Sequence, residues 1–215
     1  MSNCKAVLFD LDGTLVNSIG DLAASTNYAL EQCGYPAQPV EKYRYFVGDG
    51  IPVMLGRASG HTGDAQVIAR LLPIFMGHYH AHFVDRTVCY PGMPETLAAL
   101  LRKGIRIAVV TNKVEEMAVP ILEAIYPGVF SHIYGQRKGY ATKPDPSLTR
   151  LAMQELQVLP QECIFLGDSG VDMQTAVRSG ALPVGALWGF RTAEELLENG
   201  AKALLSSPEE LLELL

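Results

Sequence analysis

Hydrophobic positions along the chain fall into two alternating kinds of segment. Short apolar runs predict buried strands at residues 5–9, 105–110, 133–134, 163–166 and 182–186. Between them, apolar positions recur at helical spacing, which predicts helices over 94–103, 115–125, 146–156 and 172–180. Apolar strands that alternate with such helices are typical of a parallel sheet covered on both faces. The pattern therefore predicts an α/β protein with a doubly wound parallel sheet.

The stretch between the first two predicted strands breaks this alternation. It shows helical periodicity over 21–33, 51–58 and 64–83 and contains no convincing strand. Because Pro73 lies inside the last of these segments, we expect a kink or a new helix start there. We therefore predict a Rossmann-like core of residues 1–17 and 87–215 with an inserted helical domain of residues 18–86. A short amphipathic helix is expected at 208–213.

Composition and charge narrow the class of protein. The 215 residues are 48% hydrophobic and 19% charged, which is typical of a globular protein. With a net charge of -6 the chain has no basic stripe for a phosphate backbone, although a local site could still bind a small anion. No segment resembles a signal peptide or a membrane span, and the four cysteines form no C-x-x-C pair. We expect a cytoplasmic protein with free thiols and no nucleic-acid or membrane partner, either a monomer or a homodimer.

Polar side chains follow the predicted strands at the points where these end. They are Asp10 and Asp12 in FDLDGTLVNS, Thr111, Asn112 and Lys113 in VVTNK, Lys143 in KPDP, and Asp168 and Asp172 in GDSGVD. Ligands of an open parallel sheet bind beyond the carboxyl ends of its strands, so we expect these side chains to converge. Lys138 competes with Lys143 for a place there, and the flanking proline favours Lys143.

The acidic residues of this set need compensation if they share a pocket. Asp10 and Asp12 alone also fit a turn, because Asp and Gly are ordinary turn residues. Together with Asp168 and Asp172 they would place four like charges in one site, which raises the cost of ionising each. Mg2+ prefers oxygen ligands and often binds carboxylates together with a substrate phosphate. We therefore predict a Mg2+ site on these four residues, with Lys143 as a second positive charge.

Such a site suits phosphoryl transfer. Asp10 would attack phosphorus and form an aspartyl-phosphate. Asp12 would protonate the leaving oxygen and then deprotonate the water that hydrolyses the intermediate. Thr111, Asn112 and Lys143 would bind the phosphoryl group, and Thr111 and Lys143 would also take part in catalysis.

Four motifs in the same order resemble the haloacid dehalogenase superfamily of phosphohydrolases along nearly the whole chain: DLDGT, the Thr of VVTNK, the Lys of KPDP, and GDSGVD. The resemblance implies Asp10 as nucleophile and Asp12 as acid and base. It also implies that the Asp10 carboxylate, the Asp12 backbone carbonyl and Asp168 bind Mg2+ directly. Asp172 would lie next to these ligands without contacting the ion. The inserted helices resemble the cap domain of that family. Asn17, where Asp is usual, lies outside the chemistry.

The inserted segment RYFVGDGIPVMLGRA resembles the cap loop of phosphoglycolate phosphatases. This implies substrate contacts by Gly48, Asp49 and Gly50 and a small phosphorylated metabolite, 2-phosphoglycolate, as substrate. A sugar-phosphate phosphatase, a pyrophosphatase or a phosphomutase of the same superfamily are alternatives. A receiver-type phospho-acceptor switch is the alternative from another class, but it lacks both a helical insert and an acid/base two residues after the acceptor.

The segment HYHAH at 78–82 suggests zinc, because His78 and His82 share a helix face. Two ligands do not make a zinc site, so we interpret this segment as a solvated or partly packed helix.

Overall fold

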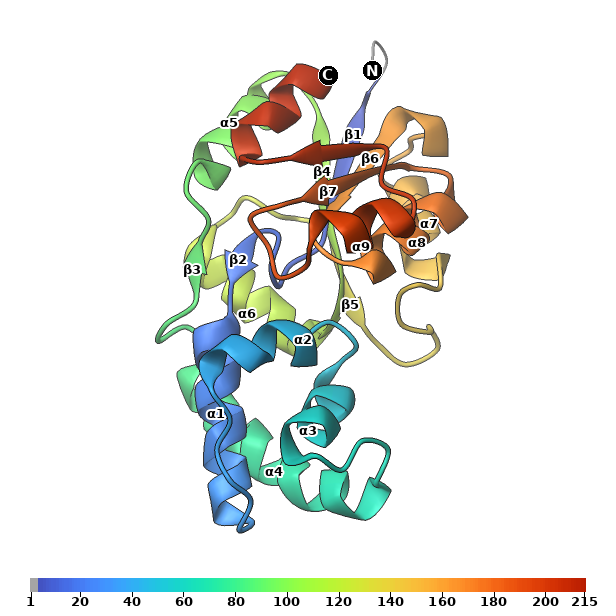
Figure 1. Ribbon diagram of the computed structural model, residues 1–215. Coiled ribbons are helices and arrows are strands. Elements are labelled where there is room, and N and C mark those ends of the chain that lie inside the picture. Colours follow the sequence, from blue (N-terminus) through green and yellow to red (C-terminus); the bar gives the residue numbers. More distant parts are fainter. Residues whose placement is uncertain (1–3) are drawn as a thin grey trace. The chain divides into compact units, whose positions relative to one another are not determined.

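The computed structural model describes residues 4–215 and divides the chain into two compact units (Figure 1). The core unit comprises the chain up to Val16 together with Cys89–Leu215, and the insert unit comprises Asn17–Val88. The chain passes between the units along β2 (Val16–Asn17) and β3 (Val88–Cys89), which pair as a two-stranded sheet. The predicted boundaries at residues 18 and 86 lie next to these strands.

The core unit is built on a parallel sheet. Within the described residues it has six strands in the order β5-β4-β1-β6-β7-β8, with parallel pairing throughout. Their bounds are β1 Ala6–Phe9, β4 Arg106–Val114, β5 Ile133–Gln136, β6 Cys163–Gly167, β7 Leu182–Ala186 and β8 Ala203–Leu205. The fully buried β1 lies at the centre, where Phe9 pairs with Val109 on one side and Leu166 on the other. The predicted α/β fold with a parallel sheet is confirmed.

Helices follow the strands as the periodicity predicts. They are α5 Met93–Arg102, α6 Glu115–Ile125, α7 Ser147–Glu155 and α8 Gly170–Ser179. A further helix, α9 Ala193–Glu198, was not predicted. Ala6 and Leu8 of β1 pack in one apolar cluster with Leu148 of α7 and Ala176 of α8, so these helices cover one face of the sheet. The C-terminal segment forms a 3₁₀ helix, Pro208–Leu214, in place of the expected short amphipathic helix, and a shorter 3₁₀ helix, Pro160–Glu162, precedes β6.

The insert unit is helical. Its elements are α1 Ile19–Gln32, a 3₁₀ helix at Val40–Lys42, α2 Tyr43–Phe46, α3 Ile51–Ser59 and α4 Ala65–His82. The expectation of a new helix start at Pro73 is wrong, because α4 continues through it. Its apolar face extends past the proline with Leu71, Phe75 and Tyr79 all buried, so tertiary packing outweighs the missing hydrogen bond. No helix in the described part of the chain is both long and apolar enough to cross a membrane.

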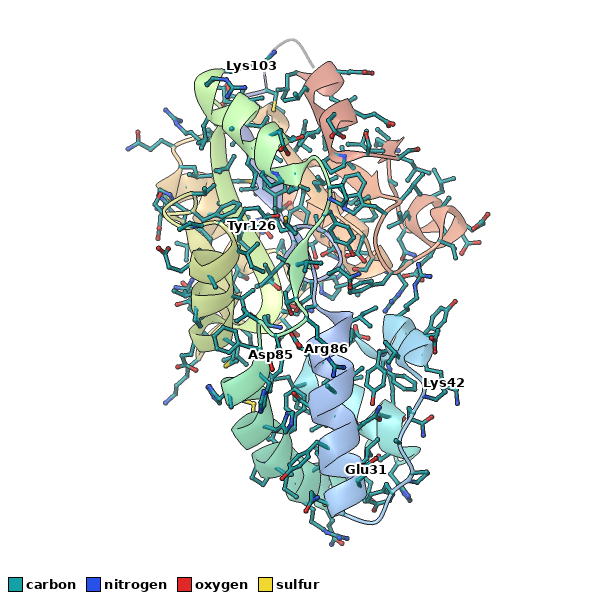
Figure 2. All side chains as sticks on the ribbon, turned by 90° about the vertical axis from the view of Figure 1, so that its left-hand side faces the viewer. Glu31, Lys42, Asp85, Arg86, Lys103 and Tyr126 are labelled. Atoms are coloured by element: carbon teal, nitrogen blue, oxygen red, sulfur yellow. The ribbon has the colours of Figure 1, made fainter. Side chains whose placement is uncertain are left out.

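The two ends of the insert unit are joined by a buried carboxylate. Asp21 in the first turn of α1 accepts hydrogen bonds from the backbone N–H of Arg86 at 3.0 Å and that of Thr87 at 2.8 Å. The Thr87 hydroxyl donates a further bond at 2.7 Å. Arg86 and its neighbour Asp85 accordingly lie beside α1 in Figure 2. Asp21 thus holds the chain that leaves the unit against the helix that begins it.

Candidate active site

The centre of the site is the carboxyl end of β1. Asp10 follows Phe9 directly, and its backbone N–H donates to Leu166 O at 3.0 Å, so the register of the sheet continues through it. The chain then turns back at Gly13, which has a positive φ of 92°. A Cβ at Gly13 would lie 2.2 Å from a carboxylate oxygen of Asp168, a contact that only glycine avoids. Gly13 therefore allows both the turn after β1 and the close approach of the chain to Asp168, which follows β6.

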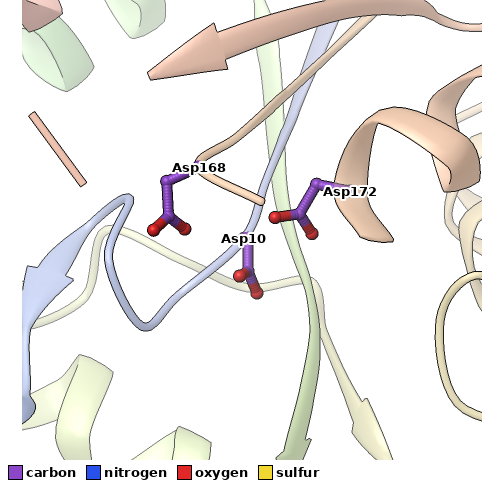
Figure 3. Close-up of side chains that lie close together, drawn as sticks. All are labelled: Asp10, Asp168 and Asp172. Atoms are coloured by element: carbon purple, nitrogen blue, oxygen red, sulfur yellow. The ribbon is translucent and has the colours of Figure 1, made fainter. Parts of the chain in front are cut away.

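Three buried carboxylates meet at this point (Figure 3). Asp10 comes from the tip of β1, Asp168 follows β6, and Asp172 lies in the first turn of α8. One ligand oxygen from each lies within 4.8 Å of those of the other two. The predicted convergence of strand ends is thus what the structure shows for these three residues.

The Asp12 carboxylate is not a member of this group. Its two oxygens lie 3.2 and 3.1 Å from Nζ of Lys113, which was expected at this edge of the sheet but without a role in the site. The pocket of four carboxylates expected from the sequence is therefore a group of three, with the fourth paired separately. Because the two partners are 101 residues apart, no local pattern could indicate this pair.

Lys143 neutralises part of the acidic group. Its Nζ lies 2.8 Å from Oδ1 of Asp10 and 2.6 Å from Oδ1 of Asp172, and its side chain is buried. Burial lowers the pKa of Lys143, but the two carboxylates outweigh this effect and hold the pKa above its ordinary value. The competing Lys138 is exposed.

The remaining charge of the site is negative. Burial, together with the neighbouring Asp172, raises the pKa of Asp10 to about 6 even though Lys143 opposes the shift. Burial and the charges of Asp172 and Asp10 also raise the pKa of Asp168 well above its ordinary value. Three buried carboxylates, of which two contact one ammonium group, fit a hard divalent cation, because Mg2+ prefers oxygen donors and excess negative charge. The residues present are thus compatible with the expected metal.

Neighbouring groups orient the acidic residues. Asp168 accepts a hydrogen bond from the Thr14 hydroxyl at 3.2 Å and another from the backbone N–H of Phe190 at 2.8 Å. A Cβ at Gly189 would lie 2.2 Å from the Asp168 side chain, so this glycine lets the loop approach. Asp172 accepts bonds from the N–H and the hydroxyl of Ser169 at 3.1 and 2.6 Å. The loop at 189–190 was missed in the sequence analysis, although it follows a predicted strand and so ends at the same edge of the sheet.

The segment Thr111–Lys113 was expected after a strand but lies within one. Strand β4 continues to Val114, and its register with β5 shifts between Val110 and Val114. Thr111 accepts a bond from the backbone N–H of Lys113 at 3.2 Å. Asn112 bonds to the backbone of Lys143, accepting from its N–H at 2.7 Å and donating to its carbonyl at 3.2 Å. The side chain of Asn112 thus anchors Lys143, and the direct phosphate contact predicted for Asn112 stays a prediction.

The loop 48–50 belongs to the insert unit. Gly48 and Gly50 have positive φ values of 122° and 91°, and Gly50 precedes α3. Asp49 forms an ion pair with Arg57 at 2.6 Å, and Arg57 also donates to the carbonyls of residues 45 and 46. The substrate contacts expected from this loop stay a prediction.

Two of the histidines of α4, His78 and His82, contact neighbouring residues. His78 Nδ1 lies 3.0 Å from the Ser25 hydroxyl, and His82 Nδ1 lies 2.7 Å from Asp85. In the described part of the chain, the group of three potential metal ligands is the one at Asp10, and it contains no histidine. This arrangement gives no support to the zinc interpretation.

The fold is a doubly wound parallel sheet with a buried carboxylate at the tip of its central strand, a buried lysine in contact with it, and two further carboxylates after the next strand. This arrangement is typical of hydrolases that act by phosphoryl transfer. Residues 7–186 match the family described as haloacid dehalogenase-like hydrolase, so the chain belongs to this family.

Relatives and a solved structure agree with this assignment. A phosphoglycolate phosphatase of Pseudomonas putida is 38% identical over 192 residues, which cover 86% of this chain and 70% of the relative. One of Chromobacterium violaceum is 34% identical over 223 residues, which cover 100% of this chain and 98% of the relative. A crystal structure from Lactobacillus delbrueckii subsp. bulgaricus, provisionally designated a phosphoglycolate phosphatase, superimposes with a TM-score of 0.92 at 31% identity, covering 99% of this chain and 98% of that one. The chain is thus a hydrolase of the phosphatase type.

Proposed function

We propose that the protein is a Mg2+-dependent phosphomonoester hydrolase that acts through an aspartyl-phosphate on Asp10. The observation that carries this proposal is the buried Asp10 carboxylate at the tip of β1, in contact with Lys143 and grouped with two further carboxylates. A carboxylate that is buried, oriented by the strand and charge-paired is suited to nucleophilic attack on phosphorus. The family and the phosphatase relatives support the same chemistry.

In the first step an oxygen of Asp10 attacks phosphorus and the bond from phosphorus to the leaving oxygen breaks. The leaving oxygen takes its proton from the Asp12 carboxyl, which becomes a carboxylate. Lys143, held between Asp10 and Asp172, stabilises the negative charge that develops on the phosphoryl oxygens. The products of this step are an alcohol and the aspartyl-phosphate.

In the second step a water molecule attacks the same phosphorus from the side on which the alcohol left. Asp12 takes a proton from this water, so the residue that acted as acid now acts as base. The bond between phosphorus and the Asp10 oxygen breaks, which restores the carboxylate and releases inorganic phosphate.

The oxygen donors at the end of β1 and after β6 suggest which residues would hold Mg2+. Asp10 and Asp168, with the backbone carbonyl of Asp12, would hold Mg2+, and Asp172 would act by positioning Lys143, to which it bonds at 2.6 Å. The ion supplies charge neutralisation at the phosphoryl oxygens. Thr14 and the backbone N–H of Phe190 fix the orientation of Asp168 for this role.

The substrate that we propose is 2-phosphoglycolate. The support is the name of the relatives, including one whose full length the chain matches. A cytoplasmic location, the helical insert as a cap and the loop 48–50 as part of substrate selection belong to the same proposal.

A substrate panel tests this assignment. We expect kcat/KM for 2-phosphoglycolate to exceed those for pyrophosphate and for several sugar phosphates. A preference for a hexose phosphate of about tenfold, or about 1.4 kcal/mol of differential transition-state binding, would overturn the substrate. Accumulation of a sugar bisphosphate in place of free phosphate would indicate a phosphomutase.

A further inference from the structure

We propose that Lys113 is a positioning residue that holds the Asp12 carboxylate in place for both proton transfers, an inference that rests on the proposed function. Lys113 Nζ lies 3.2 and 3.1 Å from the two carboxylate oxygens of Asp12. A contact to both oxygens restricts the rotation of the carboxylate as well as its place. Neither the sequence motifs nor the roles assigned above give Lys113 a function.

The ion pair of Lys113 and Asp12 is largely shielded from water. The side chain of Lys113 is 4% exposed and that of Asp12 is 14% exposed, so bulk water competes little for either charge. Breaking a buried ion pair is costly, because the charge that stays behind is less well compensated, so the two side chains are expected to stay in contact. The backbone of Lys113 is also held, because its N–H donates to the Thr111 hydroxyl. The lysine therefore projects from a strand backbone that is held next to it.

The site assigns a separate lysine to each catalytic aspartate. Lys143 contacts Asp10 and Asp172, and Lys113 contacts Asp12. Lys143 thus contacts the aspartate that becomes phosphorylated, and Lys113 contacts the aspartate that transfers protons. A displacement of about 1 Å of a catalytic group can lower a rate about a hundredfold, so a fixed Asp12 matters for rate.

The two chemical steps separate this role from a structural one. With p-nitrophenyl phosphate the leaving oxygen needs no proton, so phosphorylation of Asp10 does not depend on Asp12. Hydrolysis of the aspartyl-phosphate does depend on it, because the attacking water must lose a proton. Loss of Lys113 should therefore slow the second step and spare the first. With an alkyl phosphate, whose leaving oxygen must be protonated, both steps should slow.

Single-turnover kinetics on the full chain with Mg2+ test the proposal, with enzyme in excess over substrate. Lys113→Met keeps the length of the side chain and removes its charge, and Lys113→Gln is the second variant. Lys103→Met is the matched control, because Lys103 is exposed after the end of α5 (Figure 2). Release of p-nitrophenolate reports the first step, and release of phosphate reports the second. Glycerol 2-phosphate is the alkyl substrate.

We expect Lys113→Met to change p-nitrophenolate release by less than about twofold and to slow phosphate release by about tenfold or more. With glycerol 2-phosphate, the first step of Lys113→Met should be slower than that of the wild type by about tenfold or more. Lys113→Arg should recover part of the loss, and Lys103→Met should match the wild type. In an Asp12→Asn background, Lys113→Met should lower the rates no further, because the group that it positions is gone.

Three results would overturn the proposal. Equal slowing of both steps with p-nitrophenyl phosphate would place Lys113 on the phosphoryl group itself, and a fully additive loss in the Asp12→Asn background would give it a role independent of Asp12. Unchanged rates in both Lys113 variants would also exclude the role. A wild-type enzyme that releases neither product would instead contradict the proposed function, so the two failures are distinguishable. Thermal unfolding of each variant shows whether it is folded, and a folded Lys113→Gln replaces Lys113→Met if the latter is not.

Discussion

Asn112 and Lys143 exchange two hydrogen bonds between strand β4 and the loop before α7. The N–H of Lys143 donates to Asn112 Oδ1 at 2.7 Å, and Asn112 Nδ2 donates to the carbonyl of Lys143 at 3.2 Å. Both residues are buried. Because the pair fixes the backbone at Lys143, it also fixes the place from which the ammonium group reaches Asp10 and Asp172.

Replacing this asparagine should therefore weaken catalysis by displacing Lys143. We expect Asn112→Ala to lower kcat on p-nitrophenyl phosphate by about tenfold, since a small displacement of a charged group is enough for this. It should also lower the free energy of unfolding by about 1–3 kcal/mol, because a buried N–H and a buried carbonyl lose their partners. Steady-state kinetics and urea unfolding measure the two effects. In a Lys143→Met background, the effect on kcat should largely disappear. A normal kcat for Asn112→Ala would show that Lys143 is positioned by other contacts.

Asp10→Asn should abolish the covalent intermediate and leave the fold intact. Acid quenching of the wild type during turnover should trap a hydroxylamine-sensitive phosphoenzyme, and the variant should yield none. Without metal at pH 8 the variant should unfold at the wild-type temperature or above it. The reason is that burial and Asp172 raise the pKa of Asp10 to about 6, so the ionised carboxylate destabilises the folded protein. Substantial turnover by the variant would contradict the covalent mechanism.

The sequence predicted the parts of the site that are continuous in the chain. Asp10 and Asp168 each follow an apolar strand directly, so a strand pattern and the residue after it were enough to bring them together. Asp172 follows on the helix that starts at once after Asp168. Parallel strands all end at one edge, so topology supplied the long-range step.

The parts that could not be predicted depend on pairing across the sheet. Lys113 lies in β4 and Asp12 lies in the turn after β1, and VVTNK itself gives no sign that its lysine is buried. Strand β8 was missed because Ala203–Leu205 is short and partly exposed at the edge of the sheet. Pro73 indicated a kink or a new helix start because the local preference of proline is strong, but packing keeps α4 one continuous helix.

Mg2+ should stabilise the protein, and more so as pH rises. In the metal-free folded protein the pKa of Asp10 lies at about 6, above its ordinary value of 3.8, and that of Asp168 is also raised. The folded state therefore holds protons that the unfolded state has lost, and the stability of the metal-free protein falls as pH rises from about 4 through 6. Mg2+ binds the ionised carboxylates, so protons compete with it at low pH.

Thermal unfolding with EDTA or Mg2+ between pH 5 and 8 measures this linkage. At a hundredfold excess of Mg2+ over its Kd near pH 8, we expect a rise in Tm of roughly 5–10 °C. The rise should shrink towards pH 5 and be largely absent in Asp168→Asn. Asp85→Asn, at an exposed carboxylate, is the control and should behave as the wild type. A rise in Tm that survives in Asp168→Asn would place the ion elsewhere.

The last prediction concerns the carboxylate that closes the insert unit. Asp21 is 1% exposed and accepts bonds from the N–H groups of Arg86 and Thr87 and from the Thr87 hydroxyl. Asp21→Ala leaves these donors without their acceptor, and each buried unsatisfied group is worth about 1–3 kcal/mol. We expect a loss of roughly 2–4 kcal/mol in the free energy of unfolding, since water can reach the Arg86 N–H more easily than the buried Thr87. Asp21→Asn keeps one acceptor oxygen and should lose less. Glu31→Ala, an exposed change on the same helix (Figure 2), should be within about 0.5 kcal/mol of the wild type.

Hydrogen exchange distinguishes a local from a global effect: the amides of residues 86 and 87 should lose protection in Asp21→Ala under conditions in which those of β1 keep it. Equal protection of residues 86 and 87 in Asp21→Ala and wild type would show that this carboxylate does not hold the two ends of the unit together.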